Sequence, residues 1–545
     1  MTESRPNLTL SSTTPPQRQG DGDVRISAID IGSNSIRQII ADVSASGSIR
    51  VIDEMKAAPR LGAGLHSKGR LSETAMDEAI AVLTRMATLA TQLGAKRTRV
   101  VATSAVRDAE NGSEWLARVR QETGLRVTIL SGEEEAQLGF RSAVAHFDLA
   151  KGRAVVMDIG GGSLEVALSA GGLVERLISL PLGTIRLTER YLDKGTSPGA
   201  MRKLRRKVRK TLREELSARD WRGAQIIGSG GTFTNLGGIM LARQGLHTAR
   251  SPHGTIVSRV DLEHVLSWLS SLPQSERQAV PGLNPARADI IVAGLAVAAE
   301  VLARIEASSM VVSSYGIREG ILLDLARVTP ALADRGEARE RSVKNLAERT
   351  SYEELHAKQV QRLALQLFDS LGQRIGCAPE DRETLADAAL LHDIGYHISY
   401  DKHHKHSSHL ISHAELLGMT PAEQVVIANV ARYHRGAEPK KSHPAFASLD
   451  PESRARVVRL AAILRVADGF DRGHTASVEQ IKVRWLERAI RLTAVPAPRA
   501  GNVRLELWGA SRKSELLSKV AGVPVEIVGP SGEVVTYDDE VGSAD

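Results

Sequence analysis

The segment Ile29-Asp30-Ile31-Gly32-Ser33-Asn34-Ser35 decides the fold, because it recurs later in the chain as Met157-Asp158-Ile159-Gly160-Gly161-Gly162-Ser163. In both copies an aspartate lies near the end of an apolar strand, and a glycine and serine turn precedes the next strand. Glycine in such a turn lets backbone N–H groups approach a ligand closely, and turns of this kind bind phosphate. The two segments therefore predict two phosphate-binding turns that face each other across a cleft.

The residues around each copy repeat the same order of short strands. Helical and strand patterns alternate after each set, which predicts two α/β halves built on the same plan. The expected strands are residues 24–29, 36–43 and 49–55 in the first half, and 154–159, 164–168 and 173–180 in the second half.

Length and composition place the chain among multi-domain globular proteins. It has 545 residues, of which 42% are hydrophobic and 25% charged, and these fractions exclude a wholly disordered, collagen-like or coiled-coil chain. The single cysteine, Cys377, cannot form an intrachain disulfide, which fits a reducing cytosol. No apolar run approaches the roughly 20 residues that span a bilayer. We therefore expect a cytoplasmic protein without a membrane partner, and a disordered lead over residues 1–23 instead of a signal peptide.

The chain carries a modest excess of basic residues, with 71 Lys and Arg against 64 Asp and Glu. Part of the excess is concentrated in Met201 to Arg213, which contains eight Lys or Arg and no acidic residue. This stretch is either a solvated helix face or a basic surface that steers a polyanion. Aromatic residues make up 3% of the chain and no nucleic-acid motif is present, so we expect no specific nucleic-acid partner.

A third glycine-rich turn, residues 228–232, follows the apolar pair Ile226 and Ile227 and precedes a helical pattern. It either lines the same cleft or is a plain turn between a strand and a helix. Phosphate-bound Mg²⁺ takes oxygen ligands, and hydrolysis needs a base for water. The carboxylates available for these roles are Asp30, Asp158, Glu165 and the cluster Glu133, Glu134 and Glu135.

Seven short motifs occur in order between about Val24 and Arg327: AIDIGSNS, TSAVRDA, LSGEEEAQLGF, VVMDIGGGSLEVAL, PLGTIRL, GSGGTFTNLGG and SSYGIREGIL. Together they resemble the exopolyphosphatase and guanosine pentaphosphate phosphohydrolase (Ppx/GppA) family. This family is a branch of the sugar kinase, heat-shock chaperone and actin superfamily. The resemblance implies two actin-like (ribonuclease-H-like) lobes and a Mg²⁺-dependent phosphohydrolase, with Mn²⁺ as an alternative cation.

The resemblance also implies roles for individual residues. Glu135 corresponds to the general base for the attacking water, and Arg107 to an arginine that contacts phosphate. Asp158 and Glu165 correspond to ligands of the divalent cation, with Asp30 as a further carboxylate beside it. The positions that correspond to substrate-binding residues are Ser33, Asn34, Ser35, Gly160, Gly161, Gly162, Ser163, Gly230 and Arg318. Arg318 is alternatively part of a structural ion pair.

A second signal lies in the C-terminal half, where seven of the sixteen histidines fall between His392 and His413. His356, the pair His392-Asp393, and Asp468 follow the order of ligands in the HD phosphohydrolase superfamily, which is all-helical. Mixed imidazole and carboxylate ligands suit Mn, Fe or Zn. The residues therefore predict either a second metal centre or an inherited helical scaffold. His404, His406 and His434 are candidate additional ligands or phosphate contacts.

The predicted domains are a lead (1–23), actin-like lobe I (24–150), actin-like lobe II (151–330), a helical HD-like domain (331–478) and a small α/β domain (479–545). The predicted function is hydrolysis of terminal orthophosphate from inorganic polyphosphate. The alternatives are hydrolysis of guanosine pentaphosphate (pppGpp) and an ATP-driven actin-like or chaperone-like clamp. A homodimer is the expected assembly. The C-terminal domain is expected to contain strands at 481–485, 503–508 and 523–528.

Overall fold

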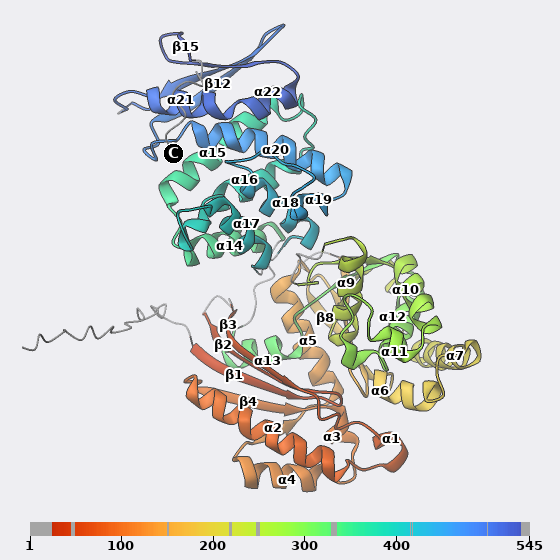
Figure 1. Cartoon of the computed structure of the whole chain (residues 1–545). Helices are drawn as coiled ribbons and strands as arrows, with labels where there is room; N and C mark the ends of the chain where they lie inside the picture. The colour runs from red at the N-terminus through yellow and green to blue at the C-terminus, as the bar shows by residue number, and fades with distance from the viewer. Residues whose placement is uncertain are drawn as a thin grey trace, which may run out of the picture.

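The computed structural model shows two α/β lobes, a helical domain and a small C-terminal sheet (Figure 1). The predicted lead, residues 1–23, lies outside the residues that the structure describes. The described residues are 24–44, 49–149, 152–216, 221–246, 251–328, 335–414, 416, 418–498 and 500–535.

Lobe I is built on a sheet with strand order β3-β2-β1-β4-β5. The first three strands form an antiparallel meander, and β4 and β5 continue the sheet in parallel with β1. The strands are β1 (Val24–Ile31), β2 (Ile36–Val43), β3 (Ile49–Ala57), β4 (Arg97–Ala102) and β5 (Val127–Ile129). The helices are α1 (Leu65–Lys68), α2 (Glu73–Gln92), α3 (Ser104–Asp108) and α4 (Gly112–Thr123).

Lobe II repeats this plan in a sheet with strand order β10-β11-β9-β6-β7-β8. Its antiparallel meander is β6-β7-β8, and β9 and β11 extend the sheet in parallel with β6. The strands are β6 (Arg153–Ile159), β7 (Leu164–Ala170), β8 (Leu173–Leu180), β9 (Gln225–Ser229), β10 (Ile256–Ser258) and β11 (Ser309–Val312). The helices are α6 (Thr184–Leu187), η1 (Thr188–Leu192), α7 (Pro198–Glu215), α9 (Gly231–Arg243), α10 (Arg259–Ser271), α11 (Gln274–Arg277), η2 (Pro285–Arg287) and α12 (Ile291–Arg304).

The repeat extends to the turns that the sequence singled out. In lobe I the Gly32 amide donates to the Ser35 carbonyl at 3.1 Å, and in lobe II the Gly160 amide donates to the Ser163 carbonyl at 3.0 Å. Each hydrogen bond closes the turn between the first two strands of a meander. The prediction of two equivalent glycine and serine turns is therefore confirmed.

Two helices cross between the lobes. Helix α5 (Gly132–His146) packs against β6, β7 and β8 of lobe II, although it precedes that sheet in the chain. Helix α13 (Ile317–Leu325) packs against β1, β2 and β4 of lobe I, and also against α5. A Cβ atom at Gly320 would lie 2.1 Å from the Leu138 carbonyl oxygen, so glycine is required where the two helices meet. Each lobe thus packs against a helix that belongs by chain order to the other lobe. The predicted boundary between residues 150 and 151 does not follow this packing.

The helical domain and the small C-terminal sheet share one hydrophobic core, which also includes Leu241 and Leu246 of lobe II. The helices are α14 (Arg335–Arg349), α15 (Glu354–Leu371), α16 (Asp381–Leu391), η3 (Ile394–His397), α17 (His403–His413), α18 (Pro421–Arg432), α19 (Pro444–Ala447) and α20 (Pro451–Gly469). The C-terminal elements are β12 (Val478–Trp485), β13 (Ile490–Pro496), α21 (Arg504–Lys513), α22 (Glu515–Ala521), β14 (Val525–Val528) and β15 (Val534–Val535).

The strand expected at residues 503–508 was wrong, because residues 504–513 form helix α21. Apolar residues at positions 503, 505 and 507 have the spacing of a strand. The structure instead buries Val503, Leu507 and Ala510, which share one helix face, and leaves Leu505 48% exposed.

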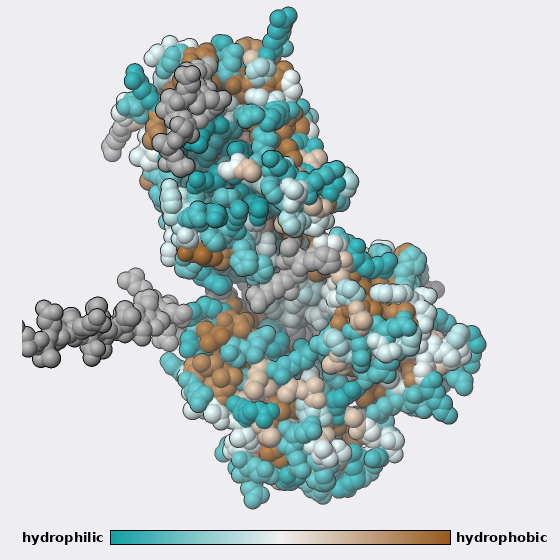
Figure 2. Space-filling model, viewed as in Figure 1, coloured by the Kyte–Doolittle hydropathy of each residue, from teal (hydrophilic) through white to brown (hydrophobic). Residues whose placement is uncertain are grey.

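The visible face of the molecule is mostly hydrophilic, with hydrophobic residues gathered in separate areas (Figure 2). Within the described parts of the chain, no helix is both long and apolar enough to cross a membrane.

The basic stretch of residues 201–213 forms part of α7, and two of its arginines make ion pairs within the lobe. Arg205 Nε contacts Glu300 Oε1, and Arg209 Nε donates to Glu300 Oε2 at 2.6 Å. The Glu300 side chain is only 3% exposed, so its charge depends on these arginines. Arg205 also donates to Glu263 at 2.6 Å, whereas Arg206 is exposed. Arg205 and Arg209 of this stretch therefore stabilise the lobe, whereas Arg206 belongs to its exposed surface.

We expect Arg205→Ala to lower the free energy of unfolding by about 1–3 kcal/mol, because Glu300 loses one of two partners for a buried charge. The matched control Arg206→Ala should change it by less than about 0.5 kcal/mol. Urea unfolding of both variants measures the difference. Equal effects would show that Glu300 does not depend on its partners.

Candidate functional site

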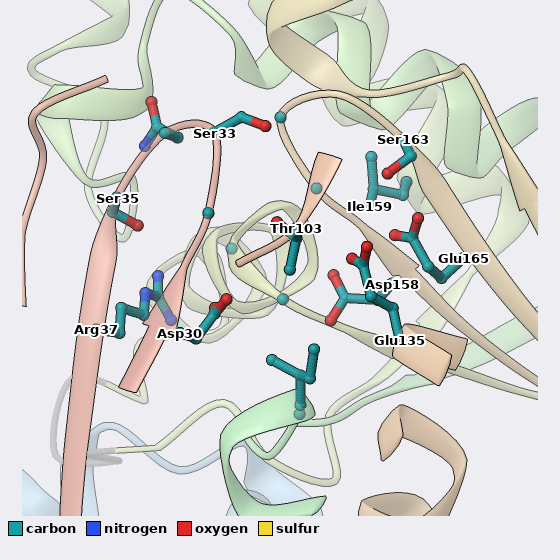
Figure 3. A pocket seen from close by; sticks show the side chains of 18 of the residues that line it. Asp30, Ser33, Ser35, Arg37, Thr103, Glu135, Asp158, Ile159, Ser163 and Glu165 are labelled. Carbon is teal, nitrogen blue, oxygen red and sulfur yellow. The ribbon is translucent and has the colours of Figure 1, made fainter. Parts of the chain in front are cut away.

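The cleft between the lobes is lined by both glycine and serine turns, the start of α9 and the start of α13 (Figure 3). The structure therefore brings together residues that lie almost 300 positions apart in the chain. Of the predicted site residues, those that line the cleft are Asp30, Ser33, Asn34, Ser35, Glu135, Asp158, Gly160, Gly161, Ser163, Glu165, Gly230 and Arg318.

Glu135 points into the cleft from the first turn of α5. A capping box places it there: Ser131 Oγ accepts from the Glu134 amide, and Glu134 Oε2 accepts from the Ser131 amide at 2.7 Å. Glu134 is thereby occupied at the helix start, and Glu135 is buried beside the cleft. Burial raises the pKa of Glu135 well above its usual range, and the nearby Glu165 adds to the rise. A carboxylate in this position is suited to accept a proton from water.

Arg107 lies behind Glu135 and outside the residues that line the cleft. Its Nη1 donates to Glu135 Oε1 at 2.6 Å and to the Leu130 carbonyl at 2.6 Å. The guanidinium therefore orients the Glu135 carboxylate and partly opposes the rise of its pKa. The structure places Arg107 against the candidate base, whereas the resemblance implied direct contact with phosphate.

Asp158 and Glu165 lie opposite each other on the paired strands β6 and β7. Ser229 Oγ donates to Asp158 Oδ2 at 3.0 Å, and Ser179 Oγ donates to Glu165 Oε1 at 3.0 Å. Burial, together with the Asp158 charge, raises the pKa of Glu165 to about 7. Figure 3 shows both carboxylates and that of Glu135 directed toward one another.

Asp30 contributes a further buried carboxylate from β1. Its Oδ1 is shielded from solvent and has no hydrogen-bond partner within the described residues. Burial raises the pKa of Asp30 to about 6, against the opposing charges of Arg37 and Arg318. A buried carboxylate oxygen without a donor is a costly arrangement unless a cation neutralises it.

These carboxylates fit a hydrated divalent cation. The most compact groups of ligand atoms found in the described residues lie in the helical domain instead of this cleft. More widely spaced carboxylates suit Mg²⁺, which keeps several waters and takes one or two protein carboxylates directly. When bound, Mg²⁺ would neutralise charge on the reacting phosphate. Asp30, Asp158 and Glu165 are the residues that would hold it.

The two turns approach each other closely at one side of the cleft. Ser33 Oγ lies 3.0 Å from Ser104 Oγ, and a Cβ atom at Gly161 would lie 2.7 Å from Ser33 Cβ. Gly162 lies outside the cleft lining, and its carbonyl accepts a hydrogen bond from Arg186 Nε at 2.8 Å. Gly162 therefore supports the turn, while Gly160 and Gly161 face the cleft.

Gly230 and Arg318 complete the predicted set. Gly230 has φ +86°, and a Cβ atom there would lie 2.4 Å from Asp158 Oδ1, so the third glycine turn is built around this carboxylate. Arg318 lines the cleft while its Nη1 donates to Glu54 at 2.9 Å. Arg318 therefore both lines the cleft and forms an ion pair with Glu54.

Sequence reasoning missed the basic side chains Arg37, Arg287 and Lys56. Arg37 and Arg287 line the cleft and also an adjoining cavity that Lys56 lines. Burial, with the charges of Arg37 and Arg287, lowers the pKa of Lys56 to about 8. The repeat holds a signal for Arg37, because it pairs with Asp30 across β1 and β2 as Glu165 pairs with Asp158. No comparable pattern marks Arg287.

Comparison with known proteins identifies the family of the chain. The Ppx/GppA phosphatase family matches residues 39–328, and domain III of the same family matches residues 338–500. The chain belongs to the Ppx/GppA phosphatase family. The resemblance inferred from its motifs is confirmed, and the chain is thereby placed among phosphatases.

Individual relatives of this Ppx/GppA phosphatase differ in their names. It is 29% identical over 439 residues to a guanosine-5'-triphosphate,3'-diphosphate pyrophosphatase of Photobacterium profundum, covering 79% of this chain and 84% of that protein. The crystal structure of an exopolyphosphatase from Cytophaga hutchinsonii has a TM-score of 0.52 and 26% identity, covering 57% of this chain and 100% of that one. The Aquifex aeolicus family member has a TM-score of 0.49 and 28% identity, covering 56% and 98%.

We expect Glu135→Gln to lower turnover by about a hundredfold or more, because an amide cannot accept a proton from water. The matched control is Glu134→Gln, which makes the same change one residue away and keeps a side chain that is able to cap α5. Phosphate release under saturating Mg²⁺ measures both. Turnover near the unsubstituted level in Glu135→Gln would place the base elsewhere.

Without a divalent cation, we expect stability to fall as pH rises from about 4.5 to about 7. The folded protein holds the Glu165 proton more tightly than the unfolded chain, so ionisation in that interval favours unfolding. Glu165→Gln should remove this part of the pH dependence. Thermal unfolding of both proteins in a chelator measures it, and added Mg²⁺ should restore stability at pH 8 to the unsubstituted protein only. If the stability of both proteins responded equally to pH and to Mg²⁺, the assignment of Glu165 as the titrating group and cation ligand would be contradicted.

Proposed function

We propose that this cleft hydrolyses the terminal phosphoanhydride bond of inorganic polyphosphate, releasing orthophosphate. One observation carries the choice of substrate: the residues that line the cleft and the adjoining cavity include several cations, and none of those described is aromatic. An inorganic phosphate chain needs charge neutralisation at intervals, whereas a nucleobase is usually held by stacking or by shaped apolar contacts.

The protein residues have distinct roles in this reaction. Backbone N–H groups of the turns at Gly161, and at Ser33 and Asn34, hold the terminal phosphate. Glu135, oriented by Arg107, positions the attacking water and takes its proton. The new bond from the water oxygen to phosphorus forms as the bond to the bridging oxygen breaks, in line with the attack.

The remaining phosphates would leave the cleft along its basic side. Arg37, Thr234 and Arg287 line both the cleft and the adjoining cavity, so the two cavities meet at these side chains. The adjoining cavity extends past Lys56 to Leu241 and Leu246, which pack into the core of the helical domain. A long substrate is therefore expected to reach the junction of lobe II with the helical domain.

A second candidate is the 5'-phosphohydrolysis of guanosine pentaphosphate. It is favoured by the name of the Photobacterium profundum relative, which covers most of the chain. The same terminal phosphoanhydride would occupy the cleft, with the guanosine in place of the rest of the polyphosphate chain. The homodimer expected from the sequence stays a prediction under either substrate.

Phosphate release from polyphosphate, pppGpp and ATP at equal concentration tests the proposal. We expect the highest kcat/KM with polyphosphate. Lys56→Gln should raise KM for long polyphosphate by about tenfold and change hydrolysis of triphosphate by less than twofold, because Lys56 contacts only phosphates beyond the cleft. The matched control Lys96→Gln removes an exposed lysine of the same lobe. A higher kcat/KM with pppGpp, or equal effects on both chain lengths, would contradict the proposal.

A further inference from the structure

Two buried histidines, His146 and His253, lie outside both sites that the sequence predicts. The residues predicted to form a second metal centre gather elsewhere, inside the helical domain; they are His356, His392, Asp393 and Asp468. His146 ends helix α5, and His253 lies three residues before β10. Both histidines line a cavity of about 150 Å³ at the junction of lobe II with the helical domain.

The walls of this cavity are largely apolar and aromatic. Its apolar and aromatic side chains are Phe147, Ile256, Val311 and Met419. The centroid of the Phe147 ring lies 4.9 Å from that of the His253 ring. Among the described residues that line the cavity, Asp148 is the only acidic one and none is a lysine or an arginine. The cavity therefore favours an uncharged ligand over a phosphate compound.

Hydrogen bonds determine the tautomer of each histidine. His146 Nδ1 lies 2.6 Å from the Ser142 carbonyl oxygen, which only accepts, so this Nδ1 carries the proton. The Ser314 amide donates to His253 Nδ1 at 3.4 Å, so this Nδ1 holds a lone pair. Burial lowers the pKa of His146 to about 4 and that of His253 to about 3, and both rings are therefore neutral at pH 7. The Nε2 atom is consequently an acceptor in His146 and a donor in His253.

The two Nε2 atoms are open to a ligand. None of the hydrogen bonds between described residues involves either atom, and the two ring centroids lie 6.0 Å apart. Each histidine is 9% exposed and lines the cavity, so the accessible part of each ring borders the cavity. A buried donor or acceptor costs free energy unless a partner satisfies it. A ligand with one donor and one acceptor would satisfy both histidines.

The size and walls of the cavity suit a flat ring. An apolar cavity of about this volume holds one benzene ring. The Phe147 ring and the Met419 thioether both pack favourably against an aromatic ring. Together with the donor and the acceptor, these walls indicate a planar ring that contains nitrogen.

The cavity lies behind two elements that form the cleft between the lobes. Helix α5 carries Glu135 in its first turn and His146 at its end. The Tyr315 ring stacks on His146 with centroids 3.7 Å apart, and the neighbours of Tyr315, Ser314 and Gly316, line the cleft. Among the described residues, none lines both the cavity and the cleft. A bound ring would therefore contact the support of the cleft without entering the cleft.

The helical domain closes the cavity from the other side. Gly418, Met419 and Thr420 line it, immediately before helix α18. Gly254 of lobe II has φ +76°, and a Cβ atom there would lie 3.0 Å from the Met419 carbonyl oxygen. Lobe II and the helical domain therefore approach closely at this point, and a bound ring would contact both.

We propose that this cavity binds a neutral, planar nitrogen heterocycle with one six-membered ring, of the pyrimidine-base type, and that binding lowers turnover in the cleft. The ring packs against Phe147 and Met419. His253 Nε2 donates to a carbonyl oxygen of the ligand, and an N–H group of the ligand donates to His146 Nε2. Turnover falls because the bound ring restrains α5 and the loop at Tyr315, which adjust as substrate enters and phosphate leaves.

Binding of uracil to the full-length protein tests the site itself. Isothermal titration calorimetry should show one site per chain with a Kd of about 1 mM or lower. In protein with ¹³C-labelled methionine methyl groups, uracil should shift the Met419 signal and leave the signal of Met76, in the core of lobe I, unchanged. Absence of binding, or an unshifted Met419 signal, would overturn the site.

Two variants test the polar contacts. His146→Phe removes the acceptor and His253→Phe removes the donor, and each keeps an aromatic ring. We expect each to weaken uracil binding by about tenfold or more, and to weaken binding of benzene, which needs neither contact, by less than about threefold. The matched control His264→Phe makes the same change at an exposed histidine of α10.

The benzene measurement shows whether the cavity survives each substitution. Circular dichroism identifies a variant that fails to fold, and the leucine variant at the same position then replaces it. Equal losses of uracil and benzene binding in folded variants would overturn the polar contacts. A loss of uracil binding in His264→Phe as large as that in the other two variants would overturn them as well.

Phosphate release with and without uracil tests the effect on turnover, with polyphosphate or pppGpp as substrate, whichever the protein hydrolyses faster. Saturating uracil should lower kcat by about threefold or more and leave KM unchanged, because the cavity lies outside the cleft. His253→Phe should weaken this response at the same uracil concentration. An unchanged kcat, or a rise in KM alone, would overturn the effect on turnover, since a rise in KM alone indicates competition in the cleft.

Discussion

The arrangement of the cleft depends on one constraint, which is the burial of several carboxylates with too few partners. Asp158 receives the Ser229 hydroxyl and Glu165 receives those of Ser163 and Ser179, while Glu135 receives Arg107. Asp30 Oδ1 receives no hydrogen bond within the described structure. Separating charge from water costs free energy that only paired charges or bound cations offset. The lobes therefore need rigid strands and exchanged helices to hold these groups together. A divalent cation bound among these carboxylates would offset part of that cost.

The repeat places opposite charges at one equivalent position of the two lobes. Both halves use the same hairpin, and the partner across the strands is Arg37 in lobe I and Glu165 in lobe II. Arg37 thus adds a guanidinium beside Asp30 in lobe I, whereas Glu165 adds a second carboxylate beside Asp158 in lobe II. The two equivalent hairpins therefore differ in charge at this one position.

Motifs predicted the strands and turns well, since their signals are local. The glycine and serine turns, the aspartates before them and the helix that begins near Glu133 needed only sequence spacing. Contacts between distant segments were not visible in that way: Arg287 comes from a short helix without a motif, and the position of Arg107 depends on how α3 meets α5. Helix α21 was misread as a strand because three apolar residues alternated by chance. Local patterns thus indicated elements, and tertiary packing decided which side chains share a site.

The boundary predicted between residues 478 and 479 separates an all-helical segment from a mixed α/β segment. It does not separate two hydrophobic cores. The helical domain and the small sheet bury one continuous core, to which β12, β13, α21 and α22 all contribute. Lys513 of α21 reaches Asp468 of α20, and Gly509 packs so closely on Gly469 that a Cβ atom there would lie 2.6 Å from its carbonyl oxygen. Removing residues after 478 would expose this core and leave the Asp468 charge without its lysine. Helix α21 therefore supplies one wall of the cavity beside Asp468, through Trp508, Gly509, Arg512 and Lys513.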